Sequence, residues 1–254
     1  LAAATGLSDT VCIHAGLHDS NAALIAARGF PEIDGKEATI LSTGTWFVAM
    51  RTPAQGVELP DLPEDRDCLI NVDAYGHPIP SARFMGGREI ETLIELDTRR
   101  VDIVADQPAL MAAVPDILAS GTMLLPCFAP GFGSFPAHLG RWINRPEDWF
   151  ARRAAVCLYA ALVAETSLSL IGTQGILLVE GRFAEAQVFV RALASLRPDL
   201  TIYTANAHND VSFGALRLVN PSLRPKGHLT RVAPLGVELT NYRRTWTTYL
   251  EGTA

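Results

Sequence analysis

The stretch Gly175-ILLVEGRFAEAQVFVRALASLRPDLTIY-Thr204 decides the fold of this chain. It opens with an apolar run that ends at Glu180 and closes with a second apolar run at 200–204, and the apolar residues of 184–196 recur at helical spacing. A strand followed by a helix and another strand predicts two parallel neighbours in one sheet, because the helical crossover returns the chain to the end where it started. We therefore expect an α/β protein whose parallel sheet is covered by helices.

Further strands are expected upstream of this unit. Glu37–Met50 contains two short strands with a tight turn at Ser42–Thr45, which is the pattern of a hairpin. A β-branched run at Asp9–Leu17 predicts a buried strand that leads into a small-residue helix with Asp19 or Ser20 at its N-cap. The other expected elements are a strand at Cys68–Ala74 within an irregular, proline-rich stretch from Thr52 to Pro80, a strand before the loop Ala129–Gly140, and helices at Phe84–Leu96, Pro108–Leu118, Pro146–Ile171 and Asp210–Val219.

The composition narrows the class of protein. The 254 residues are 48% hydrophobic and 19% charged, which is typical of a chain that buries a large core and excludes a disordered or disulfide-stapled protein. The net charge is −6, and the basic residues form no cluster, so nucleic acid is not an expected partner. Only two basic residues are lysine, Lys36 and Lys226.

No membrane span and no secretory leader are expected. The most apolar stretch, Ala154–Ile171, is interrupted by Glu165 and several hydroxyl residues, and the first ten residues contain no basic segment. The four cysteines lie singly, without the paired spacing of a zinc or redox site, so we expect reduced thiols and a cytoplasmic location. Because the chain opens without methionine, we expect a fragment or a processed chain.

The first candidate site residue is Asp19, where the expected strand ends and a helix begins. A carboxylate there either caps the helix or acts as a general base toward a hydroxyl nucleophile, and the local sequence leaves both open. Of the flanking histidines, His14 is expected in the core, and the region offers no third ligand for a metal. A hydrolase built on the His18–Asp19 pair is therefore a weaker alternative.

Two further turns have the chemistry that a phosphate or a nucleotide needs. In Ser42–Trp46 (STGTW), small hydroxyl residues around a glycine expose backbone N–H groups to an anion, although the same residues are common in ordinary turns. In Val179–Ala186 (VEGRFAEA), Gly181 ends a buried strand before a helix, as at nucleotide sites beyond the carboxyl ends of parallel strands. Neither GxxxxGK[ST] nor GxGxxG occurs, so P-loop and Rossmann sites are not indicated.

Six phrases in succession carry a resemblance to a known family. They are AGLHDSNAAL, ILSTGTW, SARFMGGREIE, LLPCFAPGFGSFP, LLVEGRF and NDVSFGALRLV. Their order and spacing over Thr5–Val219 resemble the C-terminal half of the FGGY carbohydrate kinases, members of the actin-like ATPase superfamily. The resemblance implies a ribonuclease-H-like domain over residues 1–219, with a mixed sheet flanked by helices, and a C-terminal extension over 220–254 that packs on the same domain.

The resemblance also assigns roles to individual residues. Asp19 would be the general base that deprotonates the sugar hydroxyl as it attacks the γ-phosphate of ATP. Glu180 departs from the family pattern, because it stands where the family usually has a glycine. The residues implied along the nucleotide are Thr43 and Gly44 at the phosphates, Gly87 and Glu91 at the start of the GGREIE helix, and Gly181 and Arg182 against the adenosine.

ATP and Mg²⁺ are the cofactors that the resemblance implies, with a ketose or deoxy-ketose such as rhamnulose or fuculose as the sugar substrate. The family's N-terminal domain, which carries a DxGT turn and most sugar contacts, is absent from this sequence. We therefore expect the chain to be inactive without that domain as its partner. A non-enzymatic nucleotide-binding or interaction module of the same superfamily is the alternative, and a homodimer is left open.

Overall fold

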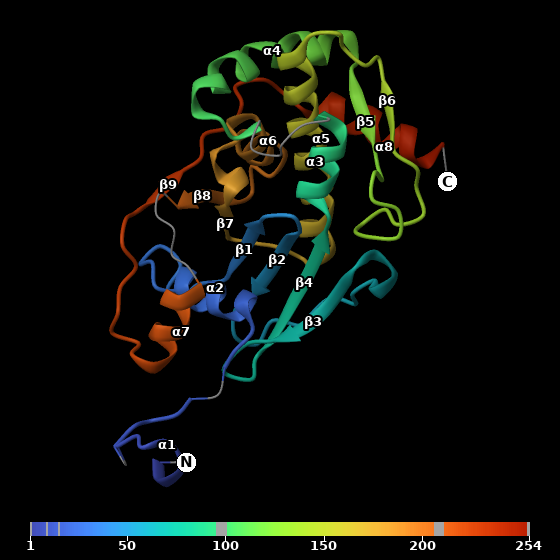
Figure 1. The fold of residues 1–254 in the computed structure, drawn as a ribbon. Helices are drawn as coiled ribbons and strands as arrows, with labels where there is room; N and C mark the ends of the chain where they lie inside the picture. The colour runs from blue at the N-terminus through green and yellow to red at the C-terminus, as the bar shows by residue number, and fades with distance from the viewer. Residues whose placement is uncertain (1, 9, 15, 95–100, 206–210, 253–254) are drawn as a thin grey trace.

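A mixed seven-stranded sheet forms the centre of the computed structural model, which describes residues 2–8, 10–14, 16–94, 101–205 and 211–252 (Figure 1). Its strands are β1 (Ala38–Thr43), β2 (Phe47–Thr52), β3 (Cys68–Val72), β4 (Pro78–Phe84), β7 (Ile176–Gly181), β8 (Thr201–Ala205) and β9 (Leu229–Arg231), in the order β3-β4-β2-β1-β7-β8-β9. A separate two-stranded sheet pairs β5 (Met123–Leu125) with β6 (Arg141–Ile143). The helices are α1 (Ala2–Thr5), α2 (Asp19–Ala27), α3 (Gly86–Ile94), α4 (Gln107–Ser120), α5 (Trp149–Leu170), α6 (Gln187–Leu196), α7 (Val211–Val219) and α8 (Thr240–Glu251), with short 3-10 turns η1 (Glu64–Arg66), η3 (Val104–Asp106) and η4 (Arg182–Glu185).

The central strands β1, β7 and β8 run parallel, and antiparallel neighbours extend the sheet on both sides. The β1–β7 register pairs Ala38 with Ile176 and Thr43 with Gly181, so the two strands end at the same level. The predicted strand–helix–strand unit is confirmed with one adjustment. Because η4 follows β7, the helix begins at Gln187 rather than at Ala184.

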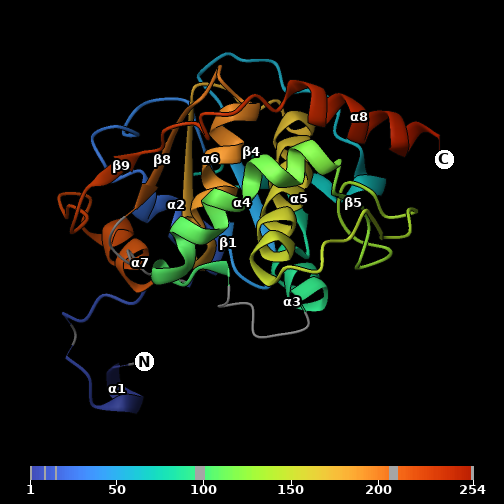
Figure 2. The ribbon, with the colours of Figure 1, turned by 90° about the horizontal axis from the view of Figure 1, so that it is seen from above.

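Helices cover both faces of the sheet (Figure 2). On one face, α3, α4, α5 and α6 enclose a core that includes Leu41, Phe47 and Val179. On the other face, α2 packs on Ile40 and Leu178. Because neighbouring residues of a strand point to opposite faces and both faces are covered, the central strand β7 is apolar over four successive residues, 176–179, rather than alternating.

Helices α2 and α7 touch backbone to backbone. A Cβ placed on Gly214 of α7 would lie 1.8 Å from the carbonyl oxygen of Ala22 on α2. A Cβ on Gly29, just after α2, would lie 2.0 Å from Nη1 of Arg217 on α7. Two helices approach this closely only where the contact lacks a side chain.

The longest helix, α5, lies in the larger core. Asp148 caps it by accepting a hydrogen bond from the Ala151 N–H at 2.7 Å, so the helix begins at Trp149 and not at Pro146 as expected. Among the described residues, α5 is the one helix long and apolar enough to cross a membrane, but 83% of its most apolar window is buried inside the fold. Its apolar composition is accounted for by this packing.

The expected strand at Asp9–Leu17 is wrong for the residues that the structure describes. Asp9 itself lies outside them, and residues 10–14 and 16–17 pair with no strand of the sheet. Val11 and Ile13 are exposed, and so is His14, which we expected in the core. A run of β-branched residues forms a strand only where its N–H and C=O groups find a neighbouring strand.

Strand β4 is the opposite case, because its first residues were expected to be irregular. Pro78 and Pro80 cannot donate backbone hydrogen bonds, and we interpreted them as breaks. Both prolines lie opposite β3, where they are the register partners of Val72 and Ile70, and the pairing of β4 with the central strand β2 begins only at Ser81. The following helix begins at Gly86, since Phe84 still belongs to β4. Its expected last residue, Leu96, lies outside the described residues, and so does Asp210, the expected first residue of a later helix.

Helix α8 packs on β5 and on the residue before it. Tyr242, Trp246 and Leu250 recur every four residues and are buried. The Trp246 Nε1–H donates to the Leu124 carbonyl at 2.7 Å, and the Tyr242 hydroxyl donates to the Thr122 carbonyl at 2.9 Å. These bonds attach α8 to β5 and the residue before it.

Candidate active site

Two turns lie side by side at one end of the sheet. Because β1 and β7 are parallel and in register, the β1–β2 turn after Thr43 is a neighbour of the β7–η4 turn at Gly181. The Thr43 hydroxyl joins them, since it donates to the Glu180 carbonyl at 2.6 Å and accepts from the Phe183 N–H at 3.1 Å. Both bonds of this hydroxyl are therefore made within the fold.

Glycine is required at two positions of this arrangement. Gly181 has a φ of +85°, and a Cβ there would lie 2.3 Å from the Thr43 carbonyl oxygen. A Cβ on Gly87, the second residue of α3, would lie 2.1 Å from the Gly44 carbonyl oxygen. Three motifs that lie far apart in the sequence therefore meet in one place, which we call the glycine-turn surface (Thr43, Gly44, Gly87 and Gly181). Thr43 and Gly87 are buried within it, Gly44 is partly exposed and Gly181 is exposed.

The N-terminus of α3 contacts the β1–β2 turn. The Gly44 N–H donates to the Trp46 carbonyl at 3.0 Å and closes the turn, and the Arg88 N–H donates to the Thr45 carbonyl at 3.4 Å. The positive end of the α3 dipole therefore lies at this turn, where it favours negative charge. Glu91 lies one helical turn further along α3 and is exposed.

Glu180 is held by a hydrogen bond beside the glycine-turn surface. Ser42 and Glu180 are register partners on β1 and β7, and the Ser42 hydroxyl donates to Glu180 Oε1 at 2.6 Å. Burial raises the pKa of the Glu180 carboxyl above its ordinary value, and the bond from Ser42 offsets part of this rise. The sheet thus accommodates a carboxyl at the position where the family usually has glycine.

A pocket of about 390 Å³ opens beside the β7–η4 turn. The Gln107 side chain fixes its walls, because Oε1 accepts from the Gln187 N–H at 2.8 Å and Nε2 donates to the Ile103 carbonyl at 2.9 Å. Arg182, which begins η4, is exposed. The sequence does not predict this pocket, because nothing in the local sequence of α4 indicates its contact with α6. The lining residues are Val104, Gln107, Pro108, Met111, Glu185, Gln187 and Arg191.

The loop Ala129–Gly140 contacts the β1–β2 turn through Phe132. The Phe132 ring packs edge-on against Trp46, with ring centroids 5.4 Å apart. The Arg83 guanidinium lies over the same Trp46 ring at 5.0 Å. The loop is held in place by the Gly133 N–H, which donates to Asp67 Oδ2 at 2.6 Å.

A buried carboxyl, that of Glu89, anchors α3 from within the core. It accepts hydrogen bonds from the Tyr159 hydroxyl on α5 and from the Cys127 thiol, whose Sγ lies 3.2 Å from Oε1. Burial raises the pKa of Glu89, although the bonds from Tyr159 and Cys127 oppose this rise. The same cluster raises the pKa of Cys127 to about 12, mainly through burial. The helix that carries Gly87 is thereby fixed to α5 and to the segment after β5.

Asp19 lies apart from the glycine-turn surface. It is the first residue of α2, whose N-cap is His18 rather than Asp19 or Ser20 as expected. Its Oδ1 accepts from the Ser20 N–H at 2.7 Å, and its side chain is 72% exposed. The first turn of α2 is anchored elsewhere, because Asn21 Nδ2 donates to the carbonyl of Val72, the last residue of β3. The Asp19 carboxylate is therefore open to solvent.

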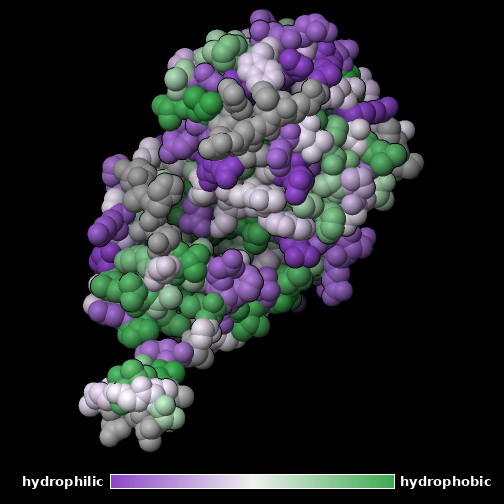
Figure 3. Space-filling model, viewed as in Figure 1, coloured by the Kyte–Doolittle hydropathy of each residue, from purple (hydrophilic) through white to green (hydrophobic). Residues whose placement is uncertain are grey.

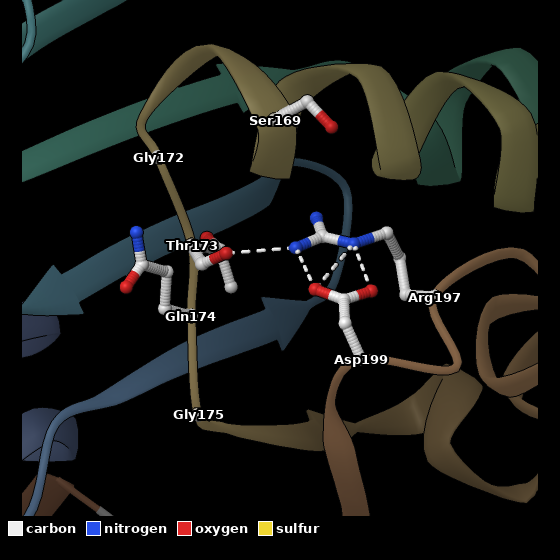
Figure 4. A pocket seen from close by; sticks show the side chains of 7 residues that line it. All are labelled: Ser169, Gly172, Thr173, Gln174, Gly175, Arg197 and Asp199. Carbon is white, nitrogen blue, oxygen red and sulfur yellow. Dashed lines mark hydrogen bonds and ion pairs between the residues drawn. The ribbon is translucent and has the colours of Figure 1, made fainter.

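Another pocket lies at the other end of β7 from Gly181 (Figure 4). Figure 4 shows the Arg197 side chain between Asp199 and the loop that precedes β7. Its Nη2 donates to the Thr173 carbonyl at 2.7 Å and to Asp199 Oδ2 at 2.7 Å, while Nε donates to Oδ1 at 2.9 Å. Because the charge of Arg197 is paired with Asp199, this side chain joins Asp199 to the loop before β7.

No group of three or more His, Cys, Asp or Glu side chains could hold a metal ion within the described ranges. The thiols are free, and Cys68, Cys127 and Cys157 are buried whereas Cys12 is exposed. Burial raises the pKa of Cys157 to about 12, so its thiol stays protonated.

Comparisons with known proteins agree with this arrangement. Residues 35–226 match the family model for the C-terminal domain of FGGY carbohydrate kinases. Among solved structures, a carbohydrate kinase from Novosphingobium aromaticivorans is 65% identical over 99% of this chain, with a TM-score of 0.92. No curated protein matches the chain.

More distant kinases share the fold. The xylulose kinase from Rhodospirillum rubrum is 15% identical over 99% of the chain, with a TM-score of 0.67, and the glycerol kinase from Plasmodium falciparum with ADP is 12% identical over 92%, with a TM-score of 0.59. The chain covers 54%, 53% and 50% of these three structures, so it spans about half their length. Its mixed sheet flanked by helices is the actin-like ATPase fold of sugar-kinase C-terminal domains. With both the family model and a 65% identical kinase matched, the chain belongs to the FGGY family of carbohydrate kinases.

Proposed function

We propose that this chain is the nucleotide-binding half of an ATP-dependent carbohydrate kinase, which transfers the γ-phosphate of ATP to a sugar hydroxyl. The observation that carries the proposal is the glycine-turn surface, where turns from three parts of the chain meet closer than any side chain would allow. Backbone turns of this kind let a polyphosphate approach amide groups directly, and the N-terminus of α3 adds the favourable end of a helix dipole.

ATP would lie along this surface from phosphates to base. Thr43, Gly44 and Gly87 are proposed at the phosphates, Gly181 and Arg182 against the adenosine, and Glu91 along the exposed side of α3. The pocket lined by Gln107 and Met111, which Glu185 of η4 also lines, would offer the adenine ring a partly apolar wall. Mg²⁺ would arrive with the ATP phosphates and neutralise part of their charge, since the described residues provide no cluster of ligands to hold it alone.

Asp19 is the proposed general base. Its carboxylate is exposed at the start of α2, so a sugar hydroxyl could approach it and transfer a proton as it attacks the γ-phosphate. A base must lie within hydrogen-bond reach of that hydroxyl, which requires the sugar to be held between α2 and the phosphates.

A second, N-terminal domain is proposed to hold the sugar and to complete the cleft. The matched kinases are about twice as long as this chain. Hydrophobic residues, in green, gather at the lower left of Figure 3, in the region of α7. Leu216 of α7 is 60% exposed, and Ile13 of the N-terminal segment is 66% exposed. An apolar face of this kind favours a protein partner. We place residues 1–219 in the kinase domain and 220–254 in its extension, and the complete enzyme would act in the cytoplasm on a ketose or deoxy-ketose.

Sugar-stimulated release of ADP measures this activity. In a protein that joins the chain to its N-terminal domain, Asp19→Asn should lower turnover by about 100-fold or more, because proton abstraction is lost. ATP affinity, measured by calorimetry, should stay unchanged. Asp61→Asn is the matched control, since Asp61 is an exposed carboxylate in the loop after β2.

Three results would contradict parts of the proposal. Unchanged turnover of Asp19→Asn would show that Asp19 is only a helix-end residue. Equal turnover of the 254-residue chain alone would remove the need for a second domain. ATP binding without any sugar-dependent turnover in the complete protein would favour a non-enzymatic module.

A further inference from the structure

A cavity of about 490 Å³ lies at the other end of β2 from the glycine-turn surface. It is formed by the segments that follow α2 and β2 and by the start of β4. β2 begins at Phe47, the register partner of Thr43, and ends at Thr52 in the cavity wall, so the two sites are separated by about 17 Å of strand. The proposed kinase chemistry makes no use of this cavity.

Basic side chains gather in the cavity wall. Arg28, Lys36 and His77 line it, and none of the described lining residues carries a carboxylate. Lys36 is one of only two lysines in the chain, and its Nζ donates to a neutral group, the Glu32 carbonyl, at 3.0 Å. This hydrogen bond therefore does not neutralise the charge of Lys36.

The Asp73 carboxylate, which contacts two lining residues, Arg28 and His77, is held mainly by other donors. Its Oδ1 accepts from the backbone N–H groups of Tyr75 and His77 at 2.8 and 2.9 Å. Burial would raise the pKa of Asp73, but these backbone bonds, with that from the His77 ring, outweigh it and lower the pKa. Arg28 Nη1 lies 3.6 Å from Asp73 Oδ2, which is too long for a hydrogen bond. Arg28 thus keeps donors for a ligand.

A buried hydroxyl gives an independent indication of a ligand. Thr52 is 8% exposed and lines the cavity, and its Oγ1 has no hydrogen-bond partner among the described residues. Buried hydroxyls in folded proteins nearly always have a partner. The oxygen is covered by protein atoms as it stands, and because Thr52 lines the cavity, a rotation of its side chain about the Cα–Cβ bond would bring the hydroxyl to an oxygen atom of a molecule there.

We propose that the cavity is a binding site for a small organic phosphate of about monosaccharide size. Its phosphate oxygens would accept hydrogen bonds from Lys36, Arg28 and the Thr52 hydroxyl, which together match the several acceptors of a phosphate. The carbon skeleton would lie on the apolar part of the wall, which includes Val57 and Ile79. The site is thus a second ligand site, at the opposite end of the sheet from the proposed nucleotide site.

Titration calorimetry of the 254-residue chain tests this site with three probes, glucose 6-phosphate, inorganic phosphate and glucose. We expect glucose 6-phosphate to bind more tightly than inorganic phosphate, and glucose not to bind. Lys36→Met should weaken the binding of glucose 6-phosphate about tenfold, and Thr52→Val about threefold or more. Lys226→Met is the matched control, because it removes the only other lysine, which is exposed and lies outside the cavity, and it should change nothing.

The thermal unfolding midpoint without ligand gives a second, independent readout. Thr52→Val should leave the midpoint unchanged or raise it, because valine has nearly the same shape and removes a buried hydroxyl without a partner. A marked fall would show that the hydroxyl has a structural partner and would overturn the proposal. The proposal also fails if neither phosphate binds, if glucose binds as well as its phosphate, or if Lys36→Met and Lys226→Met weaken binding equally.

Discussion

Gly87 faces the Gly44 carbonyl oxygen so closely that a Cβ on Gly87 would lie 2.1 Å from it. The reverse does not hold, because a Cβ on Gly44 would have its nearest neighbour at 3.8 Å, the Trp46 carbonyl oxygen. Packing therefore requires glycine on only one side of this contact, the side that belongs to α3.

This asymmetry predicts different effects of two alanine substitutions. Gly87→Ala should lower the free energy of unfolding by about 1 to 3 kcal/mol, because α3 must move away from the β1–β2 turn. Gly44→Ala should change it by about 0.5 kcal/mol or less. Urea denaturation of both variants checks this, and equal losses would mean that the turn and α3 do not constrain each other.

The Thr43 hydroxyl offers a second test, because its two hydrogen bonds join β1 to the β7–η4 turn. Thr43→Val should cost about 1 to 3 kcal/mol of stability, since it leaves the Phe183 N–H without its acceptor. Thr43→Ser keeps the hydroxyl and should retain most of the stability. If Thr43→Val weakened ATP binding while stability stayed unchanged, the hydroxyl would serve the nucleotide rather than the fold.

The buried Glu89 carboxyl predicts a pH dependence of stability. Because burial raises its pKa above the ordinary value of 4.5, the folded chain keeps this proton to higher pH than the unfolded chain. Its contribution to stability is therefore full below about pH 4.5 and falls as the pH rises through the raised pKa. Relative to Glu89→Gln, the wild type should lose stability over this range and then level off.

Denaturant midpoints measured at a series of pH values for wild type and variant give the difference directly. Glu91→Gln, an exposed change on the same helix, is the control and should follow the wild type. Parallel curves for wild type and Glu89→Gln would show that Glu89 titrates alike in the folded and unfolded chains.

Much of the fold could be predicted from the sequence, because its central elements are local and strongly patterned. The unit at 175–204 and the hairpin at Glu37–Met50 both follow from short apolar runs and turn residues. The elements that differ depend on partners that are distant in sequence. Residues 10–14 and 16–17 have a strand-like pattern without a neighbouring strand. Strand β4 forms despite Pro78 and Pro80 because it lies between β2 and β3.

The candidate site shows the same division. The glycines at 44, 87 and 181 could be identified one by one, but their convergence depends on the parallel register of β1 and β7. Gln107 could not be found from the sequence, because its role arises from one contact between α4 and α6. Asp19 could be identified as a candidate from its place at the start of a helix, and the resemblance implied its general-base role, which stays a prediction.

The contact between Gly214 and Ala22 has a consequence for motion within the domain. With no side chain between their backbones, α2 and α7 have no compressible layer that would let one helix slide while the other stays in place. We therefore expect α2 and α7 to move together as one rigid body. Any rotation that carries Asp19 toward a sugar would then also turn the apolar face of α7. The distance from Asp19 to the sugar and the contact of α7 with a neighbouring domain would then change together.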